Sequence, residues 1–156
     1  MRPELKIPLL RNRKVVIDTN VFILLVVGSI DPLLIAKNKF THQWGNEDYL
    51  VLRKIIDGAN IILVQPVLVE SSDLLGNMDG FHEHLEVIIR LYKESLIPSK
   101  QLVKSIAYNE YGLADASILE QAKKGAYVVT ADRRLSELMR RKKYNLVNFN
   151  EVIRYQ

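Results

Sequence analysis

The chain has 156 residues, a net charge of +4, a pI near 9.3 and no cysteine. Its length suits one domain with its own core, and the lack of cysteine excludes disulfides, thiolate zinc sites and cysteine nucleophiles. The longest apolar run, residues 21–28, is too short to cross a bilayer, and the first residues lack the apolar segment of a signal peptide. We therefore expect a cytoplasmic protein with no membrane partner, and the positive charge mildly favours a polyanionic one.

Residues 1–13, which contain Pro3 and Pro8, are expected to be a lead-in to a single domain spanning residues 14–156. Short β-branched runs predict buried strands, and apolar residues at helical spacing predict helices. The expected strands are 15–17, 60–64, 126–130 and 146–149, the last followed by a tail. The expected helices are 21–28, 47–57, 67–76, 81–96, 99–108, 113–124 and 132–143, with a polar loop at 38–46. This alternation predicts one three-layer α/β domain, with a central parallel sheet of four or five strands and helices on both faces.

Four carboxylates occupy corresponding places on this predicted skeleton. Asp18 ends the strand 15–17, and Asp132 follows the strand 126–130, so both should emerge at the carboxyl edge of the sheet, where open α/β sheets bind ligands. Glu70 lies about one turn into the helix after the second strand, and Asp115 lies in the first turn of the helix 113–124. We therefore expect the four side chains to point at one cleft.

Carboxylates that converge repel one another, so the arrangement favours a bound cation. Hard oxygen ligands without Cys or His select Mg²⁺ or Mn²⁺, and such ions commonly serve phosphodiester hydrolysis. Each acid also has a simpler interpretation: Asp18, Asn20 and Asp132 could cap helices, Asp115 could face a helix dipole, and Glu70 could be solvated. Four acids at corresponding places favour the metal site over these separate explanations.

The segments VVIDTNVF, PVLVES, GLADASILEQA and VVTADRRL, taken in this order, resemble the PIN-domain family of metal-dependent nucleases. The resemblance spans residues 14–149. The family's four acids fall on Asp18, Glu70, Asp115 and Asp132, and Asn20 and Thr130 match polar positions that line its site. The resemblance implies that Asp18, Asp115 and Asp132 bind the metal, and that Glu70 binds it through water or orients the nucleophile.

The same resemblance implies a Mg²⁺- or Mn²⁺-dependent endoribonuclease that acts on RNA and forms a homodimer. The family includes the toxins of toxin–antitoxin pairs, so an antitoxin protein is an expected partner. The connection at residues 29–46 is long for a compact toxin. A nuclease of rRNA or tRNA processing is therefore a second interpretation, and a non-catalytic PIN-like module that binds RNA or protein is a third.

Basic residues gather in and after the predicted helix 132–143: Arg133, Arg134, Arg140, Arg141, Lys142 and Lys143. Beside Asp132 they could contact RNA phosphates without reading base sequence. The alternative is a solvated helix whose final cations complement the helix dipole. Trp44, the single tryptophan, could stack on a base, although packing over the core is the favoured interpretation.

Overall fold

The computed structural model describes residues 6–155, so part of the expected lead-in, residues 1–5, lies outside the described residues. The strands are β1 (Lys14–Ile17), β2 (Asn60–Val64), β3 (Lys93–Ser95), β4 (Tyr127–Thr130) and β5 (Leu146–Asn148). The helices are α1 (Thr19–Ile30), α2 (Asn46–Ile56), α3 (Gln65–Leu75), α4 (Phe81–Leu91), α5 (Ser99–Leu102), α6 (Ile106–Lys123), α7 (Arg133–Arg141) and α8 (Phe149–Arg154). A short 3-10 helix, η1 (Pro32–Lys37), follows α1.

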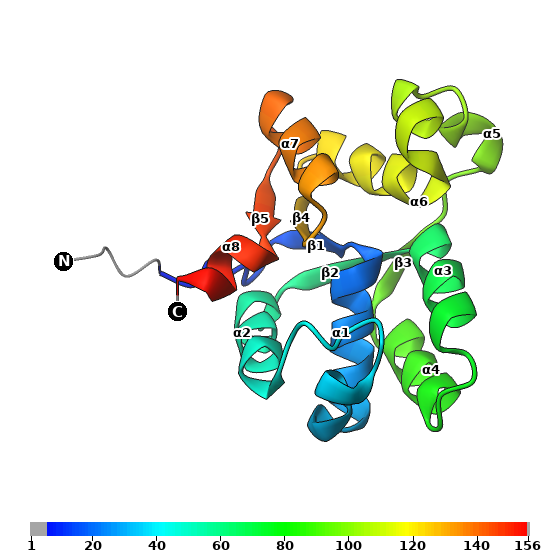
Figure 1. Cartoon of the computed structure of the whole chain (residues 1–156). Helices are drawn as coiled ribbons and strands as arrows, with labels where there is room; N and C mark the ends of the chain where they lie inside the picture. The colour runs from blue at the N-terminus through cyan, green and yellow to red at the C-terminus, as the bar shows by residue number, and fades with distance from the viewer. Residues whose placement is uncertain (1–5, 156) are drawn as a thin grey trace.

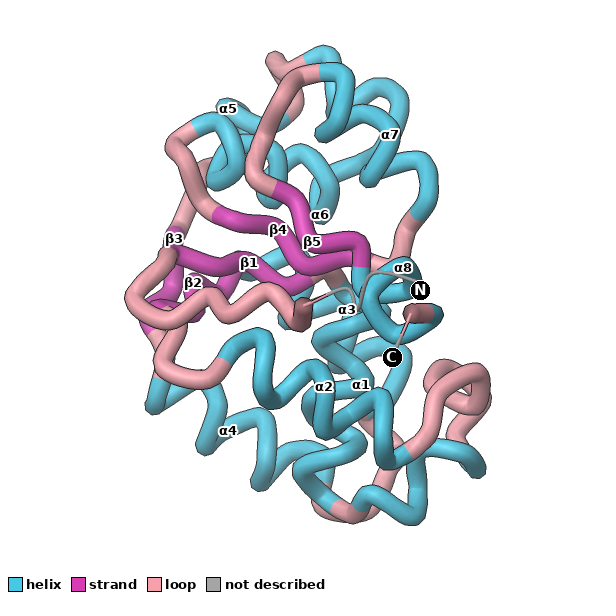
Figure 2. Tube along the Cα trace, turned by 90° about the vertical axis from the view of Figure 1, so that its left-hand side faces the viewer, coloured by secondary structure: helices cyan, strands magenta, loops and turns pink. Residues whose placement is uncertain are grey.

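The five strands form one parallel sheet in the order β3-β2-β1-β4-β5 (Figure 1). Helices α1 to α4 cover one face, and α6 and α7 cover the other, which the side view in Figure 2 shows most clearly. The predicted three-layer α/β fold with a parallel sheet is therefore confirmed. From β1 the chain builds the sheet outward through β2 and β3, whereas β4 and β5 extend it in the opposite direction. The order thus reverses between β1 and β4, where ligands bind in sheets of this kind.

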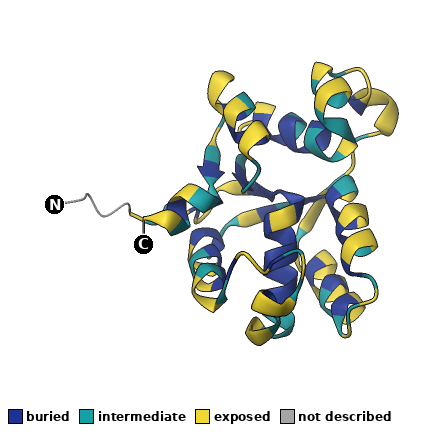
Figure 3. Cartoon of the chain, in the orientation of Figure 1, coloured by how far each residue is buried: buried dark blue, intermediate teal, exposed yellow. Residues whose placement is uncertain are grey.

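Helix α1 is the centre of the core. Its residues are apolar on every side, and those from Val21 to Gly28 are all buried (Figure 3). A helix that is hydrophobic all round needs neighbours all round. Here α2, α3, α4 and η1 contact it, and β4 lies against it from the sheet. No helix in the described part of the chain is both long and apolar enough to cross a membrane.

Three boundaries differ from the sequence-based expectation. The helix expected at 81–96 ends at Leu91, and the polar residues Lys93–Ser95 instead form the edge strand β3. The helix expected at 99–108 is the single turn α5, followed by the start of α6. Where a tail was expected, α8 forms because the Asn148 side chain accepts a hydrogen bond from Glu151 N and caps it.

Trp44 is a core residue. Its side chain is 3% exposed, its ring meets Phe149 edge-on, and its Nε1 donates to Asn150 Oδ1 at 3.2 Å. The favoured interpretation is confirmed, and a buried ring cannot stack on a base. The contact also holds the loop after η1 against α8. Leu10 is likewise buried, and its N–H donates to Ile55 O, so the described part of the lead-in packs on α2.

Replacing Gly28 by alanine should destabilise the protein, because a Cβ at this buried position would overlap the ring of Tyr49. Overpacking of a close-packed core typically costs about 1–3 kcal/mol, which exceeds the ~0.5–1 kcal/mol that alanine gains over glycine in a helix. We expect a net loss of about 1–2 kcal/mol in urea unfolding. Gly45→Ser is the control: nothing lies within 4 Å of its Cβ position, so stability should change by less than about 0.5 kcal/mol. Unchanged stability of Gly28→Ala would contradict the contact.

Candidate active site

Asp18 occupies the carboxyl end of β1 and serves as the N-cap of α1. Its Oδ1 accepts a hydrogen bond from Thr19 N at 2.7 Å, and its own N–H donates to Val129 O of β4 at 3.0 Å. The side chain is only 6% exposed. A carboxylate this deeply buried requires hydrogen-bond donors on its oxygens.

Thr130, the last residue of β4, supplies the second donor. Its Oγ1 donates to Asp18 Oδ2 at 2.7 Å and accepts from Asp132 N at 2.9 Å. This fully buried hydroxyl therefore joins the carboxyl ends of β1 and β4 across the point where the strand order reverses. The residue predicted to line the site thus lies in direct contact with Asp18.

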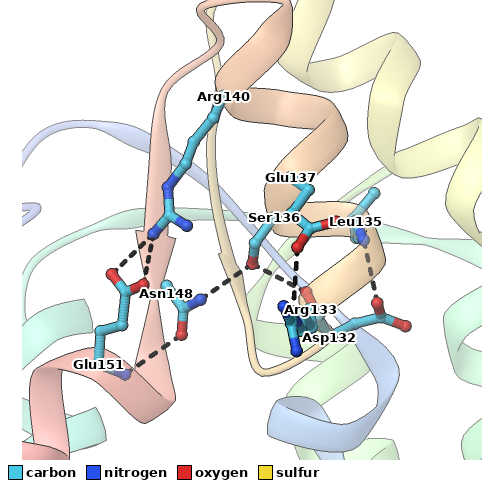
Figure 4. A network of polar contacts seen from close by, with 8 residues as sticks. All are labelled: Asp132, Arg133, Leu135, Ser136, Glu137, Arg140, Asn148 and Glu151. Atoms are coloured by element: carbon cyan, nitrogen blue, oxygen red, sulfur yellow. Dashed lines mark hydrogen bonds and ion pairs between the residues drawn. The ribbon is translucent and has the colours of Figure 1, made fainter.

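Asp132 begins α7 in the same way that Asp18 begins α1. Its Oδ1 accepts from Leu135 N at 2.9 Å, and its carbonyl accepts from the Ser136 hydroxyl (Figure 4). Both residues therefore cap helices, as the simpler interpretation required. An ionised carboxylate has about four lone-pair sites, so a capping bond leaves room for another partner.

Glu70 and Asp115 reach the site from opposite faces of the sheet, because α3 and α6 meet beyond its carboxyl edge. Glu70 is exposed on α3. Gly112 has φ +86° and ψ −174°, a left-handed conformation that interrupts α6 and starts a new helical turn at Leu113. Asp115 therefore lies in a first helical turn, as predicted, and is half-buried.

The electrostatics show that the four acids share one neighbourhood. Burial raises the pKa of Asp18, against the hydrogen bonds from Thr130 and Thr19 that lower it, and the charges of Asp132 and Glu70 raise it further. Burial also raises the pKa of Asp115 to about 7, with further contributions from the negative charges of Asp18, Asp132 and Glu70. Arg134 acts in the opposite direction and lowers the pKa of Asp115. Neighbouring acids thus raise the pKa values of Asp18 and Asp115, and Arg134 offsets part of this effect at Asp115.

The four acids offer the oxygen ligands that a hard cation prefers, but their side chains are too far apart to bind one ion together. Within residues 6–155, no three His, Cys, Asp or Glu side chains lie close enough together to hold one metal ion. The oxygens are nonetheless those that Mg²⁺ and Mn²⁺ prefer. The hydroxyl of Thr19, next to Asp18 in the chain, is also buried without a hydrogen-bond partner among the described residues. A buried hydroxyl of this kind can be satisfied by an ordered water.

A cleft of about 530 Å³ adjoins the acids between α3 and the restart of α6. Glu70 lines it together with Asp73, Tyr111 and Leu113. Asp73 and Tyr111 are not among the residues that the sequence analysis predicted at the site. The signal for Asp73 was its spacing of three residues from Glu70 on one helix. No such spacing relates Tyr111 to Asp115, because the helix is interrupted at Gly112 between them.

The basic residues separate into three groups. Arg134 stacks its guanidinium over the Tyr111 ring at 5.0 Å and lies near Asp115. Arg133 and Arg140 are held in ion pairs with Glu137 and Glu151, and Arg140 Nη2 contacts both Glu151 oxygens at 2.7 Å (Figure 4). Arg141, Lys142 and Lys143 are exposed at and just beyond the end of α7.

Asn20, predicted to line the site, is exposed in the first turn of α1.

No protein-family model matches the chain, and no curated protein matches its sequence.

The raised pKa values predict that the metal-free protein becomes less stable as pH rises. A carboxyl whose pKa is about 7 in the folded state and near 4 when unfolded holds its proton longer in the fold. Folding therefore takes up protons between these values, and stability falls as pH rises from about 4 to 7. For a partly exposed group we expect a modest drop, of about 2–4 °C in melting temperature.

The measurement is a series of thermal unfolding curves in EDTA at constant ionic strength. Asp115→Asn should flatten the decline, because it removes the group that titrates. Glu120→Gln, on the same helix, should leave the decline unchanged. A wild-type melting temperature that rises steadily from pH 4 to 7 would contradict the mutual repulsion of the acids.

Proposed function

We propose that this protein is a divalent-metal-dependent endoribonuclease. The observation that supports the proposal is that Asp18, Glu70, Asp115 and Asp132, which come from four distant segments, influence one another electrostatically near the switch point of a parallel sheet. The same residues carry the resemblance to the PIN-domain nucleases, which agrees with the proposal. The proposed setting is the cytoplasm.

Helix capping alone does not account for this arrangement. Asn or Ser caps a helix about as well as Asp and brings no charge. Asp18 and Asp132 instead place negative charge near Asp115, and the resulting repulsion lowers the stability of the fold. Clusters of like charges that lower the stability of a fold are typical of functional sites.

In this proposal Asp18, Asp115 and Asp132 would hold Mg²⁺ or Mn²⁺, and they would have to draw closer together around the ion, since no three acids within residues 6–155 lie close enough in their present positions. The bound ion would supply Lewis-acid activation of water and neutralise charge on the phosphate. Thr130 and Thr19 N keep the Asp18 carboxylate in one orientation, so that it need not reorganise during the reaction. Glu70, exposed at the cleft, would accept a hydrogen bond from the attacking water or bind the ion through water.

We propose RNA as the substrate because of Arg134 and the cleft beside it. The Arg134 guanidinium lowers the pKa of Asp115, and the Tyr111 ring on which it stacks lines the cleft. A phosphate can bind the arginine while a base lies against the exposed apolar side chains of Val69 and Leu113. Arg141 and Lys142 continue the positive charge along α7.

The sequence leaves three interpretations of the biological role open. As a toxin the protein would pair with an antitoxin and act as a homodimer, and as a processing enzyme it would act on rRNA or tRNA. A non-catalytic module would bind RNA equally well with or without Mg²⁺ and leave it intact. An enzyme should cut RNA and stop when EDTA is added, which distinguishes the two classes.

Asp115→Asn should abolish Mg²⁺- or Mn²⁺-dependent RNA cleavage, because a neutral amide binds a hard cation poorly. Glu120→Gln should cut at close to the wild-type rate, since the same type of charge is removed from the same helix away from the acids. Products, resolved on a denaturing gel after end-group analysis, should carry 5′-phosphate and 3′-hydroxyl ends. Cleavage that persists in EDTA or yields 2′,3′-cyclic phosphates would overturn the mechanism.

Arg134→Gln should weaken RNA binding by about threefold to tenfold and reduce its salt dependence by about one phosphate contact. Arg140→Gln is the matched control, because Glu151 already neutralises that guanidinium. Its effect on RNA binding should be smaller. Fluorescence anisotropy over a salt series, performed without metal, measures both. Equal losses in the two variants would show that α7 acts only through its net charge.

A further inference from the structure

A second cavity, of about 680 Å³, lies at the opposite edge of the sheet from the acids. It involves the first residues of three neighbouring strands, Lys14, Asn60 and Lys93. Its volume is within the range of small-molecule sites, about 300–1,000 Å³. The proposed nuclease chemistry makes no use of it.

Strand register determines which side chains face this cavity. Lys14 pairs with Asn60, and Ile62 pairs with Lys93. Because paired residues of parallel strands share a face and alternate residues along a strand share it too, these four side chains lie on one face of the sheet. Ser95, two residues after Lys93, lies on that face as well.

The end of α6 forms the opposite wall. Gln121 is 5% exposed, and its Nε2 donates to Ser95 Oγ at 2.7 Å, so a buried amide ties α6 to the edge strand. Lys124 follows at the helix end. Leu91 and Tyr92, at the end of α4, add an apolar and an aromatic surface.

The charge of the cavity has one sign. Lys14, Lys93 and Lys124 line it, no Asp or Glu is among its described lining residues, and none of the three lysines makes an ion pair within residues 6–155. Two helix ends nearby contribute negative dipoles, each equivalent to about half a charge. Three ammonium groups outweigh these dipoles, so the cavity favours an anion.

From these contacts we propose that the cavity binds a nucleoside phosphate, its phosphate on Lys93 and Lys124 and its base against Ile62 and Tyr92. We include a base in the proposed ligand because a planar base can pack on the apolar surface of the cavity, whereas a bare phosphate cannot. Asn60, Ser95 and Gln121 offer amide and hydroxyl groups to the base edge. The nucleoside phosphate can come from a free nucleotide or from the 5′ end of an RNA chain.

Isothermal titration calorimetry of the full chain in EDTA tests the proposal, with AMP, ATP, inorganic phosphate and a short 5′-phosphorylated RNA as probes. ATP should bind more tightly than AMP, and AMP more tightly than phosphate. Lys93→Gln/Lys124→Gln should weaken nucleotide binding by about tenfold. The matched control, Lys100→Gln/Lys123→Gln, removes the same charge from exposed lysines outside the cavity and should change it less than about twofold.

If AMP and the phosphorylated RNA compete for the cavity, the natural ligand is the 5′ end of an RNA chain. If they do not compete, the natural ligand is a free nucleotide. Absence of binding by all probes, equal losses in both double variants, or equal affinity for phosphate and AMP would overturn the proposal. Binding should survive in Asp115→Asn, so failure here is separate from failure of the nuclease proposal.

Discussion

The hydrogen bond from Thr130 to Asp18 is the constraint on which the rest of the site depends. A carboxylate at the end of a strand buried on both faces has little access to bulk water, so hydrogen-bond donors of the protein must replace most of its hydration. The threonine that provides one donor also receives Asp132 N. One hydroxyl thus fixes the ends of β1 and β4, the start of α7 and the orientation of the most buried acid.

The reversal of strand order then determines what can surround this hydrogen bond. Because the sheet grows in both directions from the β1–β4 pair, α3 and α6 lie on opposite faces and meet only beyond the carboxyl edge. Glu70 and Asp115 arrive there by that route. The result is a site whose polar contacts within the protein are largely satisfied, while its charges are not balanced.

Much of this could be predicted from the sequence, where local residue patterns coincide with the forces that decide the fold. The strands β1, β2 and β4 are short apolar runs rich in β-branched residues, which is typical of buried parallel strands. β3 is polar because it is an edge strand, so its residues carried no such signal. The placement of the acids followed from topology, whereas the pairing of Arg140 with Glu151 depends on how α8 folds back. The cavity beside Lys93 depends on register between strands, which periodicity does not encode.

The break at Gly112 has a consequence for how this chain can vary in evolution. In an uninterrupted helix, inserting one residue rotates everything after it by about 100°, which would turn Asp115 away from its neighbours. The left-handed glycine separates the turn that carries Asp115 from the segment before it. Insertions, deletions and new side chains between α5 and Gly112 can therefore accumulate without moving the acid. The wall of the cleft is free to diverge while the carboxylates keep their places.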